Sequence, residues 1–182
     1  MNFLNKFLLK KKLSLIKLIV LDVDGVLTDG NLYIDSKGNE TKRFNVKDGL
    51  GIKLLQKANI KIALISGGKS DSTIHRIKKL EIKHYFFEVK NKLKILVDLK
   101  KELNLKDSEV LYLGDDLNDL VIKKSVGIFV APNDAVKSVR DSANIVLSSI
   151  GGNGAIREIA NIILEKREFY KNILKKGWSE KN

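Results

Sequence analysis

Residues 18–30 read LIVLDVDGVLTDG. The apolar run at 18–21 is typical of a strand that is buried on both faces of a parallel sheet. Asp22 and Asp24 stand at the C-terminal end of this strand, and side chains two residues apart in an extended chain point the same way. Both carboxylates can therefore face one reacting atom or one metal ion, and the glycines that follow allow a tight turn.

The rest of the chain alternates apolar runs with segments of helical periodicity. Strands are predicted at 17–22, 60–65, 84–87, 109–113, 126–130 and 144–147. Between them, apolar residues at helical spacing occupy 50–58, 74–80 and 93–103. This alternation indicates the α/β class, with a doubly wound parallel sheet that binds ligands at the C-terminal ends of its strands. Asp22, Ser66 and Asp115 each stand at such an end.

Residues 32–44 break this rhythm and read as two short strands about a turn. They predict a small β-hairpin flap close to Asp22. An isolated hairpin is marginally stable in water, so the flap is expected to pack against its own domain or against another subunit.

The length of 182 residues suits one domain with a sizeable core. We divide the chain into a basic amphipathic N-terminal extension (1–16), a main domain (17–165) and a C-terminal tail (166–182). The absence of cysteine excludes disulfides and thiolate metal sites, and it fits a cytoplasmic protein. The extension has an apolar run too short, and too interrupted by lysine, for a signal peptide or membrane anchor, so membrane contact is not expected.

The net charge is +12, from 34 basic and 22 acidic residues. Most of the excess lies near the two ends of the chain, so it does not indicate nucleic acid as a partner. The only histidines, His75 and His84, are far from other ligand-type clusters, which argues against a Ser-His triad.

Four segments, taken in order, resemble the motifs of the haloacid dehalogenase superfamily. They are the Asp-x-Asp segment at 22–30, IALISG at 62–67, Lys92, and LYLGDDLND at 111–119. Phosphatases of this superfamily use the Asp pair and a magnesium ion. Larger members insert a cap domain, for which this chain has no room between 30 and 60 or between 67 and 92.

The resemblance is closer to one capless branch, the 3-deoxy-D-manno-octulosonate 8-phosphate phosphatases. The opening Asp-x-Asp segment, FNVKDG at 44–49 and GGNGAIRE at 151–158 carry it. It implies a small bacterial sugar-phosphate phosphatase that serves lipopolysaccharide or nonulosonate synthesis. It also implies a homotetramer in which hairpin 32–44 pairs between subunits.

The resemblance implies a catalytic role for four side chains. Asp22 would attack phosphorus and form an aspartyl-phosphate, while Asp24 would protonate the leaving oxygen and later activate water. Ser66 and nearby backbone N–H groups, at a strand-to-helix turn, would bind the phosphoryl oxygens. Lys92 would balance the phosphoryl charge.

Lys90 and Lys94 surround Lys92, and any of the three could be solvated surface. The pattern Asn91-Lys92-Leu93, which the family shares, selects Lys92.

Carboxylates beside a phosphate require a hard cation, and Mg²⁺ prefers a few oxygen ligands plus water. The expected ligands are Asp22, the carbonyl of Asp24, and Asp115. Asp116 is either a further ligand or a residue that orients the ligands. Asn118 and Asp119 are expected to hold the loop, and Asp116 or Asn118 to cap a helix.

Substrate contacts are harder to assign. The candidates are Gly67, Lys47, Asp48, Gly49, Lys69, Arg76 and Asn118. Asp48 could equally cap the next helix. At the position of Gly68 the octulosonate enzymes commonly have arginine and nonulosonate-specific relatives glutamate, so Lys69 or Arg76 becomes the candidate partner of a sugar carboxylate.

The sequence therefore predicts a Mg²⁺-dependent phosphatase for an acidic sugar phosphate, first of all 3-deoxy-D-manno-octulosonate 8-phosphate. The alternatives are a nonulosonate 9-phosphate phosphatase and a non-catalytic scaffold subunit that keeps the fold. A phosphomutase would need a mobile cap to exclude water from the phospho-enzyme, which the chain has no room to form.

Overall fold

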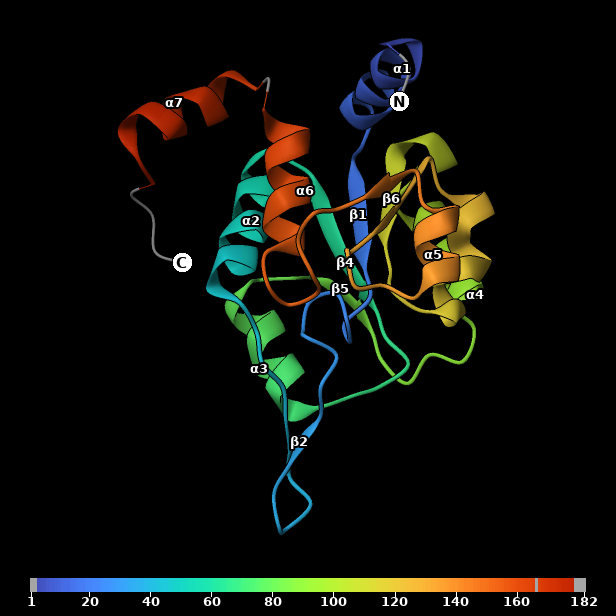
Figure 1. Cartoon of the computed structure of the whole chain (residues 1–182), viewed down its shortest axis with the longest axis vertical. Helices are drawn as coiled ribbons and strands as arrows, with labels where there is room; N and C mark the ends of the chain where they lie inside the picture. The colour runs from blue at the N-terminus through green and yellow to red at the C-terminus, as the bar shows by residue number, and fades with distance from the viewer. Residues whose placement is uncertain (1–2, 166, 179–182) are drawn as a thin grey trace.

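Six parallel strands form the central sheet, in the order β5-β4-β1-β6-β7-β8 (Figure 1). The computed structural model describes residues 3–165 and 167–178. In chain order the strands are β1 (Leu18–Leu21), β4 (Lys61–Ile65), β5 (His84–Phe86), β6 (Val110–Leu113), β7 (Ile128–Ala131) and β8 (Ile145–Val146). Five strands lie within their predicted ranges and β7 ends one residue beyond the predicted 126–130, so the doubly wound α/β fold is confirmed.

Helices cover both faces of the sheet. One face packs against α2 (Val46–Lys57), α3 (Asp71–Lys79) and α6 (Ala155–Leu164). The other packs against α4 (Lys92–Glu102), the 3₁₀ helix η2 (Leu117–Ser125) and α5 (Lys137–Ser142). Strand β1 shows the reason, because Ile19 and Leu21 enter the first core while Leu18 and Val20 enter the second. A strand that is apolar at every position must be covered on both sides.

The predicted hairpin is present and extends away from the sheet, beyond the end of β1 (Figure 1). Its antiparallel strands are β2 (Tyr33–Ile34) and β3 (Glu40–Thr41). A bridge between Thr28 and Phe44 closes its base. We call residues 32–44 the flap. No cap domain accompanies the flap in the part of the chain that the structure describes.

The N-terminal extension forms α1 (Phe3–Ser14), which packs on the domain through only part of its surface. Leu13 is buried and Leu9 packs against the same core as α2, but Phe7 and Leu8 are exposed. The remaining short element is η1 (Asp107–Glu109), a 3₁₀ turn that directly precedes β6.

The C-terminal tail forms a helix, α7 (Glu168–Lys176). Arg167 Nη1 donates to the Ala58 carbonyl at 2.9 Å, Tyr170 is buried, and Trp178 packs against the core. Residues 166 and 179–182 lie outside the described residues. Among the described helices, none combines the length and the apolar character needed to cross a membrane.

Candidate active site

The three predicted strand-end side chains meet at one edge of the sheet. Strand β1 lies between β4 and β6, with Leu21 paired to Leu64 and to Leu113, so the chain leaves all three strands at the same level. Asp22, Ser66 and Asp115 follow within one or two residues. Asp22 and Ser66 are buried. The fold therefore brings together residues that are up to 93 positions apart, as expected for a parallel sheet.

A buried lysine joins two carboxylates at the centre of this edge. Lys92 Nζ lies 2.9 Å from Asp22 Oδ2 and 2.7 Å from Asp119 Oδ1. Burial alone would lower the pKa of Lys92, but the two carboxylates outweigh it and raise that pKa above its usual value. Lys90 and Lys94 are exposed, so of the three neighbouring lysines the structure places only Lys92 against Asp22.

Sequence reasoning gave Asp119 a loop-holding role and missed its contact with Lys92. Asp119 Oδ2 accepts from the backbone N–H groups of Asp115 at 2.9 Å and Asp116 at 3.3 Å. Its Oδ1 accepts from Tyr112 Oη as well as from Lys92. Asp119 therefore fixes the loop after β6 and orients Lys92. No local signal reveals the second role, because 27 residues separate the partners.

Asp115 carries a buried oxygen, Oδ1, that has no hydrogen-bond partner. Burial first, and then the charges of Asp22 and Asp119, raise the pKa of Asp115 to about 8. Burial and the charge of Asp119 likewise raise the pKa of Asp22 to about 6, against the lowering effect of Lys92. The loop after β1 approaches closely, since a Cβ on Gly25, at φ +79°, would lie 2.0 Å from Asp115 Oδ2. Crowded carboxylates with an unpartnered oxygen fit a cation.

The donor set fits a hard divalent metal. Oxygens of Asp22, Asp115 and Asp119 all lie within 4.8 Å of one another. Both oxygens of Asp119 and both oxygens of Asp22 already have protein partners, whereas Asp115 Oδ1 has none and is free to bind a metal. The predicted roles of Asp22 and Asp115 as ligands stay predictions. Asp116 is exposed and its side chain caps η2 through Leu117 N–H at 2.6 Å. Its role as a ligand, like that of the Asp24 carbonyl, stays a prediction.

The raised pKa of Asp115 makes the stability of the metal-free protein depend on pH. The folded state holds this proton up to about pH 8, whereas an unfolded aspartate loses it near 3.8. The stabilisation is therefore complete below about pH 4 and is lost as the pH rises through 8. We expect the melting temperature of metal-free protein to fall over this range, by about 2–4 °C for each kcal/mol lost.

The measurement is a thermal melt from pH 4.5 to 8.5 with a chelator present. Asp115→Asn should flatten the profile, whereas Asp98→Asn, an exposed change on α4, should leave it unchanged. Added Mg²⁺ should stabilise the wild type most at high pH, because a metal competes with protons for the carboxylates. A metal-free melt that does not fall with pH, or that Asp115→Asn does not alter, contradicts the expectation.

Asp24 is half-buried, and a residue that sequence reasoning missed holds its carboxylate. Lys42 Nζ, from the flap, lies 2.7 Å from Asp24 Oδ1 and 2.9 Å from Oδ2. The pairing joins residues 18 positions apart through tertiary structure, and no sequence motif marks Lys42.

Ser66 Oγ accepts from Gly68 N–H at 3.1 Å, in the exposed turn that contains Gly67. The turn leads into α3, whose N-cap is Ser70. Ser66 and Gly67 therefore occupy the predicted place at a strand-to-helix turn beside Asp22.

The structure separates the other candidate substrate contacts. Asp48 is fully buried, and its oxygens accept from Gly154 N–H at 3.0 Å and Arg157 N–H at 2.9 Å. It therefore holds the start of α6. The alternative that it caps the next helix is wrong, because Asn45 caps α2.

Lys47, Lys69 and Asn118 are exposed, and Lys69 lies 3.8 Å from Glu88. Arg76 Nη2 donates to the Asn45 carbonyl at 3.1 Å, and its buried Nε has no hydrogen-bond partner. Gly49 packs against this guanidinium, since a Cβ there would lie 2.2 Å from Nη2. Their roles as substrate contacts stay predictions.

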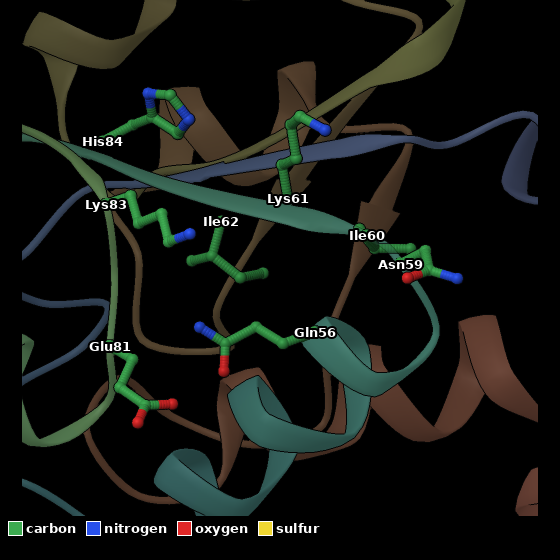
Figure 2. A pocket seen from close by; sticks show the side chains of 8 residues that line it. All are labelled: Gln56, Asn59, Ile60, Lys61, Ile62, Glu81, Lys83 and His84. Atoms are coloured by element: carbon green, nitrogen blue, oxygen red, sulfur yellow. The ribbon is translucent and has the colours of Figure 1, made fainter.

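A pocket of about 720 Å³ lies elsewhere, between α2 and the start of β4 (Figure 2). Figure 2 shows Gln56 on α2 facing Ile62 of β4, with Glu81 on the loop before β5. Gln56 donates to the Leu80 carbonyl, and Glu81 pairs with Lys53. The pocket lies at the N-terminal ends of the strands, away from Asp22, and none of the candidate catalytic, metal-binding or substrate-binding residues lines it.

The fold and the acidic centre define a haloacid dehalogenase-like hydrolase, and the model of that family matches residues 41–127. A 3-deoxy-D-manno-octulosonate 8-phosphate phosphatase from Haemophilus influenzae is 41% identical over 157 residues, which cover 86% of this chain and 87% of the relative. The chain therefore belongs to the 3-deoxy-D-manno-octulosonate 8-phosphate phosphatase family.

Solved structures of the same superfamily are also similar to this chain. A hydrolase of this superfamily, subfamily III A, from Legionella pneumophila has a TM-score of 0.90 and 40% identity, with 94% of each chain covered. The Moraxella catarrhalis phosphatase of the same family has a TM-score of 0.88 and 35% identity, with 93% of this chain and 97% of that chain covered. The Moraxella structure is described as a complex with a magnesium ion, a phosphate ion and the octulosonate sugar.

Proposed function

We propose that this protein is a Mg²⁺-dependent phosphomonoesterase that hydrolyses 3-deoxy-D-manno-octulosonate 8-phosphate to the free sugar and phosphate. The observation that carries the proposal is the contact of Lys92 with Asp22, 2.9 Å long, beside the unpartnered carboxylate oxygen of Asp115. The family relationship supports the substrate.

In the first half of the reaction Asp22 attacks phosphorus in line with the leaving sugar oxygen. The P–O bond to the sugar breaks, an aspartyl-phosphate forms, and Asp24 gives its proton to the sugar oxygen. Lys92 and the Ser66 hydroxyl stabilise charge on the phosphoryl oxygens. Asp22, Asp115 and the Asp24 carbonyl would hold Mg²⁺, which would supply positive charge to offset the repulsion between the carboxylates and the phosphate.

In the second half Asp24, now a carboxylate, removes a proton from water. The water attacks the aspartyl-phosphate, and the P–O bond to Asp22 breaks to release phosphate. The proton leaves with the released phosphate, so Asp24 is a carboxylate in the free site and takes up a proton as the next ester binds. Asp22 and Asp24 are two residues apart in the loop that follows β1, so one short segment presents both carboxylates to the same phosphorus.

Gly68 occupies the position that bears on which sugar the enzyme accepts. A Cβ at this position would lie 3.5 Å from Asp24 Oδ2, so any side chain there would contact the acid-base residue. Glycine leaves that space open and supplies neither the arginine nor the glutamate that its relatives use. A nonulosonate 9-phosphate is therefore the second candidate substrate.

The test is phosphate release with Mg²⁺ from a panel of octulosonate 8-phosphate, nonulosonate 9-phosphates, hexose phosphates and a nucleotide. We expect the highest kcat/KM for the octulosonate ester. Preference for a nonulosonate 9-phosphate would assign the enzyme to nonulosonate synthesis and leave the proposed phosphatase mechanism unchanged. Absence of turnover on the whole panel would overturn the proposal in favour of a scaffold subunit.

We further propose a homotetramer in which the flap packs against neighbouring subunits. Leu32, Tyr33 and Ile34 are 46–64% exposed on this two-stranded hairpin. A hairpin of this size is marginal alone, and adjacent exposed apolar side chains indicate an interaction surface. We also propose that the enzyme acts in the cytoplasm, in lipopolysaccharide sugar synthesis.

Ile34→Lys should dissociate the assembly, because it places a charge in the apolar contact of every subunit. Sedimentation velocity should show the wild type as a tetramer and the variant as smaller species. Val121→Lys is the matched control, since Val121 is 55% exposed on η2 and far along the chain from the flap. If Ile34→Lys sediments like the wild type, the flap is not the interface.

A further inference from the structure

The carboxylate of Asp24 is neutralised by an ammonium group that the flap supplies. Lys42 follows directly after β3, and its Nζ contacts both oxygens of Asp24 and, at 3.3 Å, Glu40 Oε1. The side chain of Lys42 is 3% exposed. Lysine is rarely buried unless paired, and such pairs add little net stability because both charges lose their hydration. The function of the Lys42–Asp24 pair is therefore inferred from its position and not from a contribution to the stability of the fold.

The pair lies beside Gly68 and Ser66, in the turn to which the proposed function assigns the phosphoryl oxygens. A Cβ on Gly68 would lie 4.0 Å from Lys42 Nζ and 4.0 Å from Ser66 Oγ, in addition to its 3.5 Å separation from Asp24 Oδ2. The carboxylate of Asp24, the ammonium of Lys42 and the hydroxyl of Ser66 therefore surround the position that a side chain at residue 68 would fill. That position is open because residue 68 is glycine.

Charge balance gives Lys42 a role there. The site holds the carboxylates of Asp22, Asp24, Asp115 and Asp119, which Lys92, Lys42 and one divalent ion together offset. A phosphate monoester adds about 1.5 to 2 negative charges. Without Lys42 the carboxylate of Asp24 would repel this group across a few ångströms, in a partly buried place where such interactions are strong.

We propose that Lys42 is a positioning residue that holds the Asp24 carboxylate and cancels its charge, so that the phosphoryl group can enter beside it. The flap thereby contributes a charge to the anion-binding centre. The location of the phosphoryl group rests on the proposed function and does not depend on which sugar carries it.

The experiment is calorimetric titration of inorganic phosphate into the Mg²⁺-loaded protein. Lys42→Met should weaken phosphate binding about tenfold or more, because an uncompensated carboxylate then faces the anion. Asp24→Asn should bind phosphate at least as tightly as the wild type, since Lys42 then has an excess positive charge. The double variant Asp24→Asn/Lys42→Met should recover wild-type affinity to within about threefold, because it loses both charges together.

Two controls complete the experiment. Lys42→Arg should keep most of the affinity, and Lys37→Met, an exposed change in the same flap, should keep all of it. Thermal melts report whether each variant is folded. The recovery in the double variant is the decisive readout, since a lysine that only braced the flap would leave the double variant as weak as Lys42→Met.

Wild-type affinity in Lys42→Met, or no recovery in the double variant, would overturn the inference. So would a wild type that binds no phosphate. The proposed function fails separately, through absence of turnover on the sugar-phosphate panel, while the phosphate titrations still report on Lys42.

Discussion

Asp22→Asn is expected to lower phosphate release by about 10⁴-fold or more, because the variant lacks the nucleophile and the other groups of the site act through it. The fold should persist. Asparagine has the same shape, and its carbonyl oxygen can still accept from Val23 N–H, which lies 2.7 Å from Asp22 Oδ1. Removing one charge from the cluster also reduces the repulsion that raises the pKa of Asp115.

The measurement pairs kcat/KM for the best panel substrate with a thermal melt of each protein. Acid-quenched wild type should also yield a phosphorylated peptide that contains Asp22, and the variant should not. Asp98→Asn, on the exposed face of α4, is the matched control and should retain full activity. Activity in Asp22→Asn above about one hundredth of wild type would remove Asp22 as the nucleophile.

The sequence predicts the sheet and the strand-end acids because both depend on local pattern. Apolar runs such as 18–21 mark strands buried on both faces, and the parallel topology then places Asp22, Ser66 and Asp115 at one edge. No further information is needed to bring these three together, even though they come from distant parts of the chain.

The contacts that sequence reasoning missed are those made by tertiary structure. Lys42 reaches Asp24 because the base of the flap, where Thr28 bridges to Phe44, joins the loop after β1. Asp48 lies in a segment that resembles a substrate loop, yet its partners at the start of α6 are more than 100 residues away. A charged residue in a lysine-rich chain has no local feature that separates such a contact from solvated surface.

Lys92→Met is expected to impair both stability and catalysis, because Lys92 is the cation that Asp22 and Asp119 share. Methionine keeps much of the side-chain volume but leaves two buried carboxylates without their ion-pair partner. Breaking a buried pair in this way costs about 3–5 kcal/mol. Loss of a charge aimed at the phosphoryl oxygens should lower kcat by about 10²–10³-fold.

The stability loss should depend on pH, which separates lost charge from lost packing. Lys92 lowers the pKa of Asp22, so without it Asp22 holds its proton to a pH above about 6. At acidic pH the variant can protonate Asp22, which removes part of the free-energy cost of an unpaired buried carboxylate. The loss of unfolding free energy relative to the wild type should therefore be larger at pH 8 than at pH 5. A deficit caused by packing alone would be the same at both values.

Lys94→Met provides the comparison that makes this result specific to position 92. Lys94 is exposed on the first turn of the same helix, so its replacement should change the free energy of unfolding by less than about 0.5 kcal/mol. Urea unfolding of the three metal-free proteins at pH 5 and pH 8 gives the free energies directly. If Lys92→Met and Lys94→Met were indistinguishable, the buried contact with Asp22 would not be what organises this site. If Mg²⁺ narrowed the gap between Lys92→Met and the wild type, the ion would be offsetting the same carboxylates that Lys92 neutralises.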